Sequence, residues 1–234
     1  MGTLYLVATP IGNLEDVTLR ALRILGEVTL IAAEDTRTTR KLLTRHVIKA
    51  RLVSYHQFSG EGRMRSLLNI LEHDDVALVS EAGMPAISDP GYPLVRSALQ
   101  HGIAVVAVPG PSAVLTALAV SGLPTHQFVY LGFLPRKPGE RRKMLASLEG
   151  EERTVVAFES PHRMRRMLQD LNDVLPERPV ALCRELTKVH EEIYRGDAAN
   201  ALEHFMQPRG EFTVVIGGAG LRAADHWKAG PVED

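Results

Sequence analysis

Short apolar runs alternate along this chain with stretches of helical periodicity. The strand-like runs are residues 4–8, 28–33, 52–54, 76–79, 104–108 and 128–131. Between them, apolar residues recur at helical spacing, as at Met64, Leu67, Leu68 and Leu71. Strands that alternate with helices are typical of βαβ units, so we expect an α/β fold with a mostly parallel N-terminal sheet.

The pattern is interrupted at residues 134–139 (Leu-Pro-Arg-Lys-Pro-Gly), whose Pro, Gly and charged residues predict a linker. Beyond it, we expect helices at 140–148, 162–174 and 198–205, and strands at 154–158, 180–183 and 212–217. The prediction is therefore an N-terminal α/β domain at 1–133, the linker, a C-terminal α/β domain at 140–218, and a weakly ordered tail at 219–234.

The composition is that of a globular protein, with 234 residues, 45% of them hydrophobic and 24% charged. No apolar run approaches the ~20 residues of a membrane helix. The N-terminus lacks the basic lead-in of a signal peptide, so we expect none. The single cysteine, Cys183, lies in an apolar run and is expected to be a core residue. Because one cysteine cannot form an internal disulfide, these features favour a cytoplasmic protein.

The net charge of −1 hides a local excess of basic residues. Three basic islands occur within residues 34–51, 134–143 and 163–166. Such islands are consistent with solvated helix surface or with a phosphate-binding face, and charge alone does not separate the two.

The most unusual loop comprises residues 80–91 and follows the buried run at 76–79. It contains two Gly and two Pro together with Glu81 and Asp89. In an open α/β sheet, ligands bind outside the carboxyl ends of the strands. The loop is therefore either part of a small-molecule site or an ordinary strand-to-helix connection.

Other strand ends carry similar signals. Pro10 and Gly12 shape a turn after the first strand, and Ser112, after Pro-Gly-Pro, is placed as a helix N-cap. Glu34, Asp35 and Arg37 follow the second strand. They suit either the orientation of a substrate or an ion-paired helix start that Asp35 caps.

The C-terminal part repeats this arrangement. Glu159, Ser160, His162 and Arg163 follow the strand at 154–158, and residues 184–188 (Arg-Glu-Leu-Thr-Lys) follow the next one. Dinucleotide, Walker and nucleophile-elbow patterns are absent from the sequence. Its histidines lack metal-ligand spacing, so we predict no metal.

Taken together, the segments 9–14, 33–37, 80–91, 109–113, 132–135, 158–163, 184–188 and 210–212 closely resemble one family. It is the ribosomal RNA small subunit methyltransferase I family, within the tetrapyrrole methylase superfamily. The resemblance covers about residues 3–218. It implies two α/β domains of the class III methyltransferase type, with a cofactor cleft between them.

The resemblance also implies the reaction. The methyl donor would be S-adenosylmethionine. The acceptor would be the 2′-hydroxyl of a cytidine in small-subunit ribosomal RNA, either naked or in a 30S-type particle. A homodimer is implied as well. Many relatives carry a further C-terminal helical module, which we expect to be absent here or to have been removed.

Matching positions imply the site residues. The cofactor contacts would be Pro10, Glu81, Gly83, Met84, Ile87, Ser112, Ala113, Phe158, Glu159, Leu186, Glu211 and Phe212. Met84 replaces the Asp of the superfamily's Gly-Asp-Pro, so we expect this loop to contact the cofactor through its backbone and through Glu81 or Asp89.

The residues expected to face the substrate or act in catalysis are Glu34, Asp35, Arg37, Glu159 and Lys188. A positioned base contributes about 10²–10⁴-fold to such a transfer, and Glu185 and His162 are further candidates for it. The basic islands would contact phosphates. Stacking with a base would fall to Tyr5, Phe58, Tyr92, Phe133 or Phe158.

Two other functions are also consistent with the sequence. One is a methylase that acts on a tetrapyrrole carbon, whose anionic substrate would also suit arginines. The other is a nucleotide-binding module without turnover.

Overall fold

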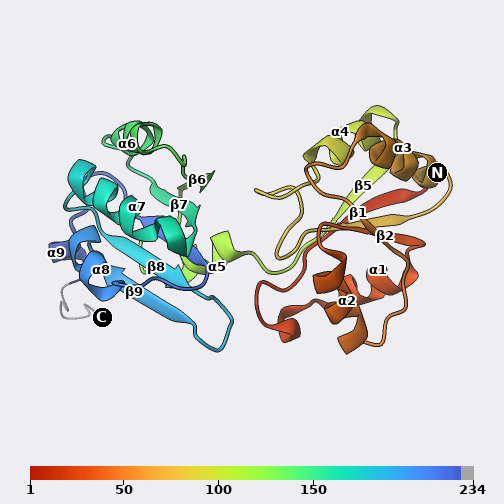
Figure 1. The fold of residues 1–234 in the computed structure, drawn as a ribbon, viewed down its shortest axis with the longest axis horizontal. Helices are drawn as coiled ribbons and strands as arrows, with labels where there is room; N and C mark the ends of the chain where they lie inside the picture. The colour runs from red at the N-terminus through yellow and green to blue at the C-terminus, as the bar shows by residue number, and fades with distance from the viewer. Residues whose placement is uncertain (228–234) are drawn as a thin grey trace. The chain divides into compact units, whose positions relative to one another are not determined.

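The computed structural model describes residues 1–227, and they form two compact units, each with its own five-stranded sheet. Unit 1 is Met1–Ser112 and unit 2 begins at Ala113 (Figure 1). Within the described part of the chain, every helix is too short or too polar to cross a membrane.

The sheet of unit 1 has the strand order β3-β2-β4-β1-β5, and every neighbouring pair is parallel. This confirms the expected parallel N-terminal sheet. The strands are β1 Thr3–Val7, β2 Leu30–Ala33, β3 Leu52–Ser54, β4 Val76–Val79 and β5 Ala104–Val108.

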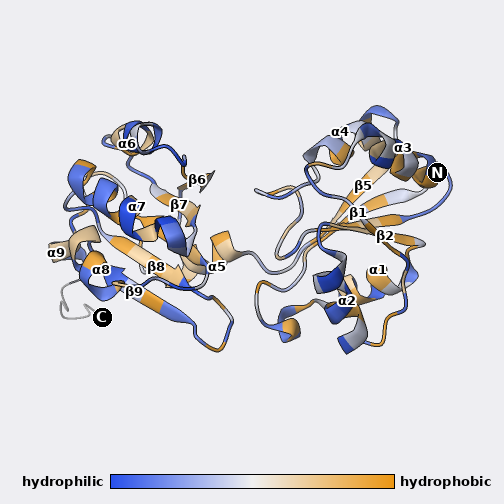
Figure 2. Cartoon of the chain, in the orientation of Figure 1, coloured by the Kyte–Doolittle hydropathy of each residue, from blue (hydrophilic) through white to orange (hydrophobic). Residues whose placement is uncertain are grey.

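Helices cover both faces of this sheet. They are α1 Leu19–Glu27, α2 Thr36–Arg45, α3 Glu61–Leu71 and α4 Tyr92–Gln100, with a short 3-10 helix η1 at Leu14–Asp16. Because successive side chains of a strand point to opposite faces, Ile31 and Ala33 pack with α1 and α2, whereas Leu30 and Ala32 pack with α3 and α4. Figure 2 shows the resulting apolar strands between more polar helices.

Unit 2 is a mixed sheet with the order β6-β7-β10-β8-β9, in which only β6 and β7 are parallel neighbours. The strands are β6 Phe128–Phe133, β7 Thr154–Glu159, β8 Val180–Arg184, β9 Glu192–Gly196 and β10 Phe212–Ile216. The helices are α5 Ala113–Val120, α6 Pro138–Ala146, α7 Pro161–Val174, α8 Ala198–His204 and α9 Ala223–His226.

The core of unit 2 lies mainly between its sheet and α6, α7 and α8. Met164, Met167 and Leu168 of α7 are fully buried there. Helix α5 contacts β7 and β10, and the Cys183 thiol lies 3.9 Å from the carbonyl oxygen of Ala117 in that helix. The expected burial of Cys183 is confirmed.

The boundary between the units differs from the predicted one. Strand β6 pairs with β7, as at Val129 and Val155, so residues 113–133 belong to unit 2. The predicted linker at 134–139 is therefore a connection inside unit 2. An apolar run indicates a strand but carries no signal for the sheet that the strand joins.

Two other expectations change. Strand β9 was not predicted, because its sequence Glu-Ile-Tyr-Arg-Gly has only a short apolar run. Residues 223–226 of the predicted tail form α9. The rest of that tail, from residue 228, lies outside the described residues.

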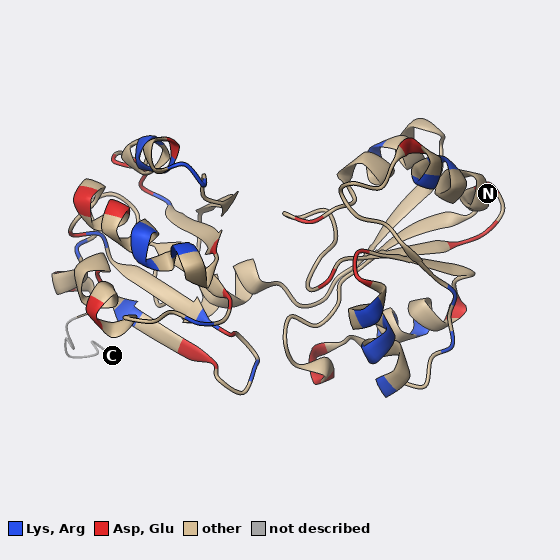
Figure 3. Cartoon of the chain, in the orientation of Figure 1, with Lys and Arg blue, Asp and Glu red and all other residues tan. Residues whose placement is uncertain are grey.

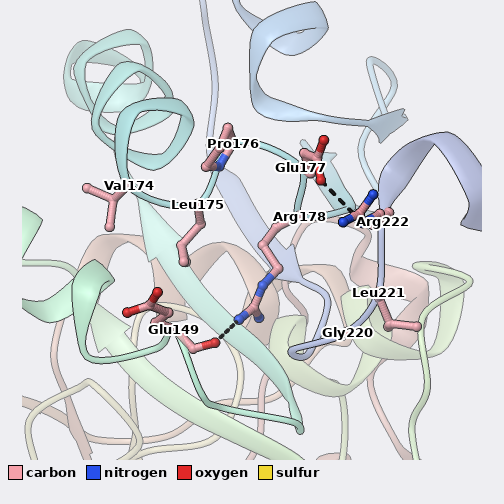
Figure 4. Close-up of a pocket in the computed structure, with 9 residues that line it drawn as sticks. All are labelled: Glu149, Val174, Leu175, Pro176, Glu177, Arg178, Gly220, Leu221 and Arg222. Atoms are coloured by element: carbon pink, nitrogen blue, oxygen red, sulfur yellow. Dashed lines mark hydrogen bonds and ion pairs between the residues drawn. The ribbon is translucent and has the colours of Figure 1, made fainter.

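A buried arginine joins the segments at one end of unit 2. The Arg178 guanidinium donates to the carbonyl oxygens of Leu148, Glu149 and Gly217 at 2.9, 2.7 and 2.8 Å. Burial lowers the pKa of this group. It borders a hollow of about 350 Å³, which is also lined by Glu177 and Arg222, an ion pair at 3.3 Å (Figure 4). Because the N–H groups of Arg178 already donate to backbone carbonyl oxygens, we infer that Arg178 stabilises the fold and that this hollow is not a ligand site.

The last described residues dock onto the same unit. The Trp227 indole donates to the carbonyl oxygen of Gly196 at 3.2 Å. The His226 ring lies 2.9 Å from the carbonyl oxygen of Gly122.

Candidate active site

Three loops at the carboxyl edge of the unit 1 sheet lie side by side. Thr9 and Gly83 form a two-residue bridge, in which each backbone N–H donates to the other's carbonyl oxygen at 2.9 and 3.0 Å. Ala8 donates to the carbonyl oxygen of Val108 at 3.1 Å. The turn that carries Pro10, the loop 80–91 and the segment leading to Ser112 are thus brought together.

The loop 80–91 has an unusual backbone. Gly83, Ala86, Ser88 and Gly91 have φ values of 76°, 70°, 62° and 142°. Ala86 and Ser88 occupy a region that costs a residue with a Cβ about 1–2 kcal/mol. Strain of this kind persists only where the surroundings impose it, and it clusters at binding sites. The loop is therefore built to hold a particular shape, as a backbone-contacting ligand site requires.

The loop also gathers acidic groups. The Glu34 carboxylate accepts the backbone N–H of Glu81 at 3.2 Å. Burial raises the pKa of Asp89 to about 6; a hydrogen bond from Ser80 lowers it, and the charges of Glu34 and Glu81 raise it further. Asp89 therefore exchanges its proton nearer neutrality than an ordinary carboxyl.

Asp35 is engaged in capping. Its carboxylate accepts the N–H groups of Arg37 and Thr38 at 2.7 and 3.4 Å and pairs with the Arg37 guanidinium at 3.2 Å. Hydrogen bonds from Arg37 lower the pKa of Asp35. Of the two alternatives for this segment, the structure shows the capped, ion-paired helix start. A catalytic role for Asp35 or Arg37 stays a prediction.

Glu159 is the most unusual carboxyl in unit 2. It ends β7 and is only 2% exposed. One oxygen accepts from the Ser160 N–H at 2.7 Å and from Arg163 at 2.6 Å. The other oxygen, Oε2, is buried without a hydrogen-bond partner among the described residues. Burial raises the pKa of Glu159, while Ser160 and Arg163 oppose the rise. An orphaned buried acceptor calls for a donor that a ligand could supply.

Lys188 lies in an ion-pair network after β8. Its ammonium donates to Glu185 at 2.9 Å and to Glu211 at 2.7 Å, and Glu185 also accepts the Glu211 N–H at 2.8 Å. Burial alone would lower the pKa of Lys188, but its bonds to Glu211 and Glu185 raise it. Lys188 therefore holds its proton and is unsuited to be the base. As a charged donor it stays a predicted site residue.

The same network explains Gly210. Its φ is +82°, and an added Cβ would lie 2.5 Å from Glu185 Cγ. Only glycine lets the Glu185 carboxyl approach this closely. Leu186 and Phe212 are 7% and 3% exposed, so their side chains belong largely to the core.

The remaining cofactor predictions are half-buried or exposed. Ile87 is 52% exposed, whereas Pro10, Met84, Ser112 and Ala113 are half-buried. Phe158 packs between Tyr130 and Phe133, at centroid distances of 5.4 and 5.5 Å. Whether these residues contact a cofactor stays a prediction.

Figure 3 shows where the basic residues lie along the ribbon. Only some of them are available to contact RNA. Arg141 was expected to contact RNA, but it is 3% exposed and pairs with the buried Asp170 at 2.6 Å. This expectation is wrong, because the side chain is inside α6–α7 packing. Arg142 also pairs, with Asp173 at 3.1 Å. Among the described residues, no cluster of metal ligands is found.

The family is shown by comparison with known proteins. Residues 3–202 match the family model described as tetrapyrrole (corrin/porphyrin) methylases. A solved uroporphyrin-III C-methyltransferase from Thermus thermophilus, complexed with S-adenosylhomocysteine, has a TM-score of 0.62 at 22% identity over 92% of this chain and 97% of its own. That likeness shows the fold. The chain belongs to the tetrapyrrole methylase family.

Two curated relatives show which branch of the family the chain belongs to. A protein of Halalkalibacterium halodurans is 50% identical over 94% of this chain and 77% of its own length. One of Thermotoga maritima is 49% identical over 93% of this chain and 99% of its own. Both are called ribosomal RNA small subunit methyltransferase I. The chain belongs to this branch of the family, as its motifs indicate.

Proposed function

We propose that this chain methylates the 2′-hydroxyl of a cytidine in small-subunit ribosomal RNA, with S-adenosylmethionine as donor. The observation that carries the proposal is the near-complete match, at about half identity, to relatives with that name. Each unit by itself carries a feature that supports a ligand contact: the strained loop 80–91 in unit 1 and the orphaned Glu159 oxygen in unit 2.

S-adenosylmethionine fits these features. Its amine and hydroxyl groups are donors of the kind that Glu159 Oε2 lacks. The left-handed backbone at Ala86 and Ser88 fixes the shape that the loop presents to a ligand. When bound, the cofactor supplies an electrophilic methyl group. The chain's residues must align the accepting hydroxyl with it, and such alignment can contribute up to roughly 7–11 kcal/mol.

The chain must also accept the proton of the hydroxyl. Of the predicted candidates, Asp35 is already bound by Arg37, and Lys188 holds its own proton. Burial raises the pKa of Glu159, and its Oε2 has no hydrogen-bond partner among the described residues. We propose Glu159 as the residue that binds or deprotonates a ligand group, with Glu34 and Arg37 facing the substrate.

The test is transfer of labelled methyl from S-adenosylmethionine to small subunits that lack the modification, and in parallel to naked ribosomal RNA. We expect label on the ribose of one cytidine, where it blocks alkaline cleavage of the adjoining linkage. Glu159→Gln should retain the fold and lose at least tenfold in rate, because general-base or ligand contacts of this kind contribute 10²-fold or more.

Other outcomes decide against the proposal. Label on a base would exclude ribose methylation. Label on a tetrapyrrole precursor but not on RNA would favour the C-methylase alternative. Cofactor binding without any transfer would favour the non-catalytic module.

We further propose a homodimer, which the family resemblance implies, and a cytoplasmic location, which the single cysteine favours. Sedimentation of the full chain at micromolar concentration would contradict the dimer if only the monomer mass were found.

A further inference from the structure

A second concave site lies in unit 2, at the carboxyl ends of the parallel strands β6 and β7. It has a volume of about 640 Å³ and is lined by Phe133, Leu134, Pro135, Arg136, Ser160 and Arg163. That volume is within the range of small-ligand sites, about 300–1,000 Å³. The resemblance assigns none of the lining residues to the cofactor.

Arg163 is held in place on one wall. Its guanidinium pairs with Glu159 at 2.6 Å, donates to the carbonyl oxygen of Leu134 at 3.2 Å, and lies 3.4 Å from the Ser160 hydroxyl. A fifth of the side chain, 21%, remains exposed. The group is therefore pre-organised, and a fixed guanidinium is well suited to bind a phosphate.

Arg136 supplies a second positive charge. It is exposed, and within residues 1–227 its side chain has no ion-pair partner. The nearby Lys137 pairs instead with Glu140 at 3.2 Å. Helix α7 begins beside the cavity without a side-chain cap from Ser160, so its N-terminal dipole adds to the positive potential.

The remaining wall is aromatic. Phe133 is 56% exposed although it ends an apolar strand. Its ring lies 5.5 Å from that of Phe158, which in turn packs against Tyr130. The exposed ring thus has a rigid support. Aromatic rings of this kind, next to positive charges, are the platform on which single-stranded nucleic acids stack.

We propose that this cavity binds one nucleotide of the RNA substrate, with its phosphate on Arg136 and Arg163 and its base stacked on Phe133. The proposal rests on the proposed function, because it assumes an RNA substrate. A phosphate alone would account for the arginines but not for the supported, exposed ring.

The test measures binding of a short single-stranded RNA, labelled with a fluorophore, to the full chain by anisotropy. Phe133→Ala should weaken binding about tenfold, as loss of one stacked base predicts. Phe133→Trp should restore it, whereas Phe133→Leu, which keeps the apolar packing, should not. Phe128→Ala is the matched control, because Phe128 is an exposed aromatic at the opposite end of the same strand, β6.

Arg136→Ala should weaken binding severalfold and reduce the slope of log affinity against log salt by about 0.7, the value for one phosphate on a single strand. Arg96→Ala removes the same charge from an exposed position on α4 in unit 1, outside the basic islands, and should change neither quantity. Variants with native circular dichroism and an unchanged thermal midpoint qualify for comparison.

Equal binding by Phe133→Ala, Phe133→Leu and wild type would overturn the proposal. The proposal would also be overturned if only Arg136→Ala weakened RNA binding and inorganic phosphate displaced the RNA as well as a nucleotide does. The site would then be a phosphate contact only. The proposed function fails separately. If wild type transfers no methyl to RNA yet binds the oligonucleotide in a Phe133-dependent manner, the proposed methylation is wrong, whereas the proposed nucleotide site in the cavity is supported.

Discussion

Asp89 shows how one residue of the loop 80–91 links charge to stability. Its pKa is raised to about 6, chiefly by burial, so the folded chain binds a proton there more tightly than the unfolded chain does. The stabilising effect of that proton is complete below about pH 4 and is lost as the pH rises through about 6.

We therefore expect Asp89→Asn to be more stable than wild type at pH 7.5, by on the order of 1–2 kcal/mol, and equal to it at pH 4. The charged neighbours are Glu34 and Glu81, so the gain should shrink if Glu34 is also neutralised. Urea unfolding at both pH values measures the effect. Glu72→Gln, at an exposed position of unit 1, should show no such difference. A gain that is the same at both pH values would contradict the argument.

Single residues also show where sequence patterns stop. The sequence after β2 predicts that Asp35 caps a helix, because an Asp directly before a helix is a local signal. The burial of Arg141 was not foreseen, since a basic residue in a charged stretch resembles solvated surface. Nor does the sequence show that Glu159 keeps an unpartnered oxygen, because that depends on packing from distant elements.

At the scale of elements, the ion pair between Arg141 of α6 and Asp170 of α7 holds two helices together inside the core. Removing Asp170 leaves the buried Arg141 charge uncompensated, which typically costs about 3–5 kcal/mol. Removing Arg141 leaves Asp170 with Arg142, whose guanidinium lies 3.5 Å from it, so the loss is smaller.

We expect Asp170→Leu to destabilise the fold by roughly 3–5 kcal/mol and Arg141→Met by less, and the double variant to recover most of the loss caused by Asp170→Leu. Chemical denaturation of the four proteins gives the coupling energy. Glu140→Gln removes the exposed pair with Lys137 and should cost less than about 1 kcal/mol. Additive losses in the double variant would show that the two groups do not act as a pair.

The strands were predicted to within a few residues wherever apolar runs were clear, as at β3, β4 and β5. Two facts about the elements were beyond the sequence. The partner of β6 is decided by long-range pairing with β7, and β9 is held at a sheet edge by backbone pairing with β8.

For the whole molecule, the family resemblance provided what periodicity could not. Alternating strands and helices predict an α/β chain, but only the set of motifs distinguished this branch. The place where unit 1 ends, at Ser112, is a property of the assembled sheets and was misplaced by local composition.

Cys183 offers a measure of how unit 2 opens. It is the chain's only cysteine, it is buried, and burial raises the pKa of its thiol to about 12. Only the thiolate reacts with disulfide reagents, so folded chains at pH 8 should be nearly inert.

We expect the labelling rate to follow the unfolding of unit 2, rising with urea in step with the loss of that unit's structure. Fluorescence of Trp227, the only tryptophan and also in unit 2, is the parallel measurement. Rapid labelling of the native protein, before any change in fluorescence, would show that β8 opens locally.

The bridge between Thr9 and Gly83 has a mechanical consequence. Two hydrogen bonds tie the turn after β1 to the loop after β4, so neither segment can be displaced alone without breaking both. A ligand that displaces one segment therefore displaces the other, and the two segments move as one unit. Amide exchange at Thr9 and Gly83 should therefore slow together, by one common factor, when such a molecule binds.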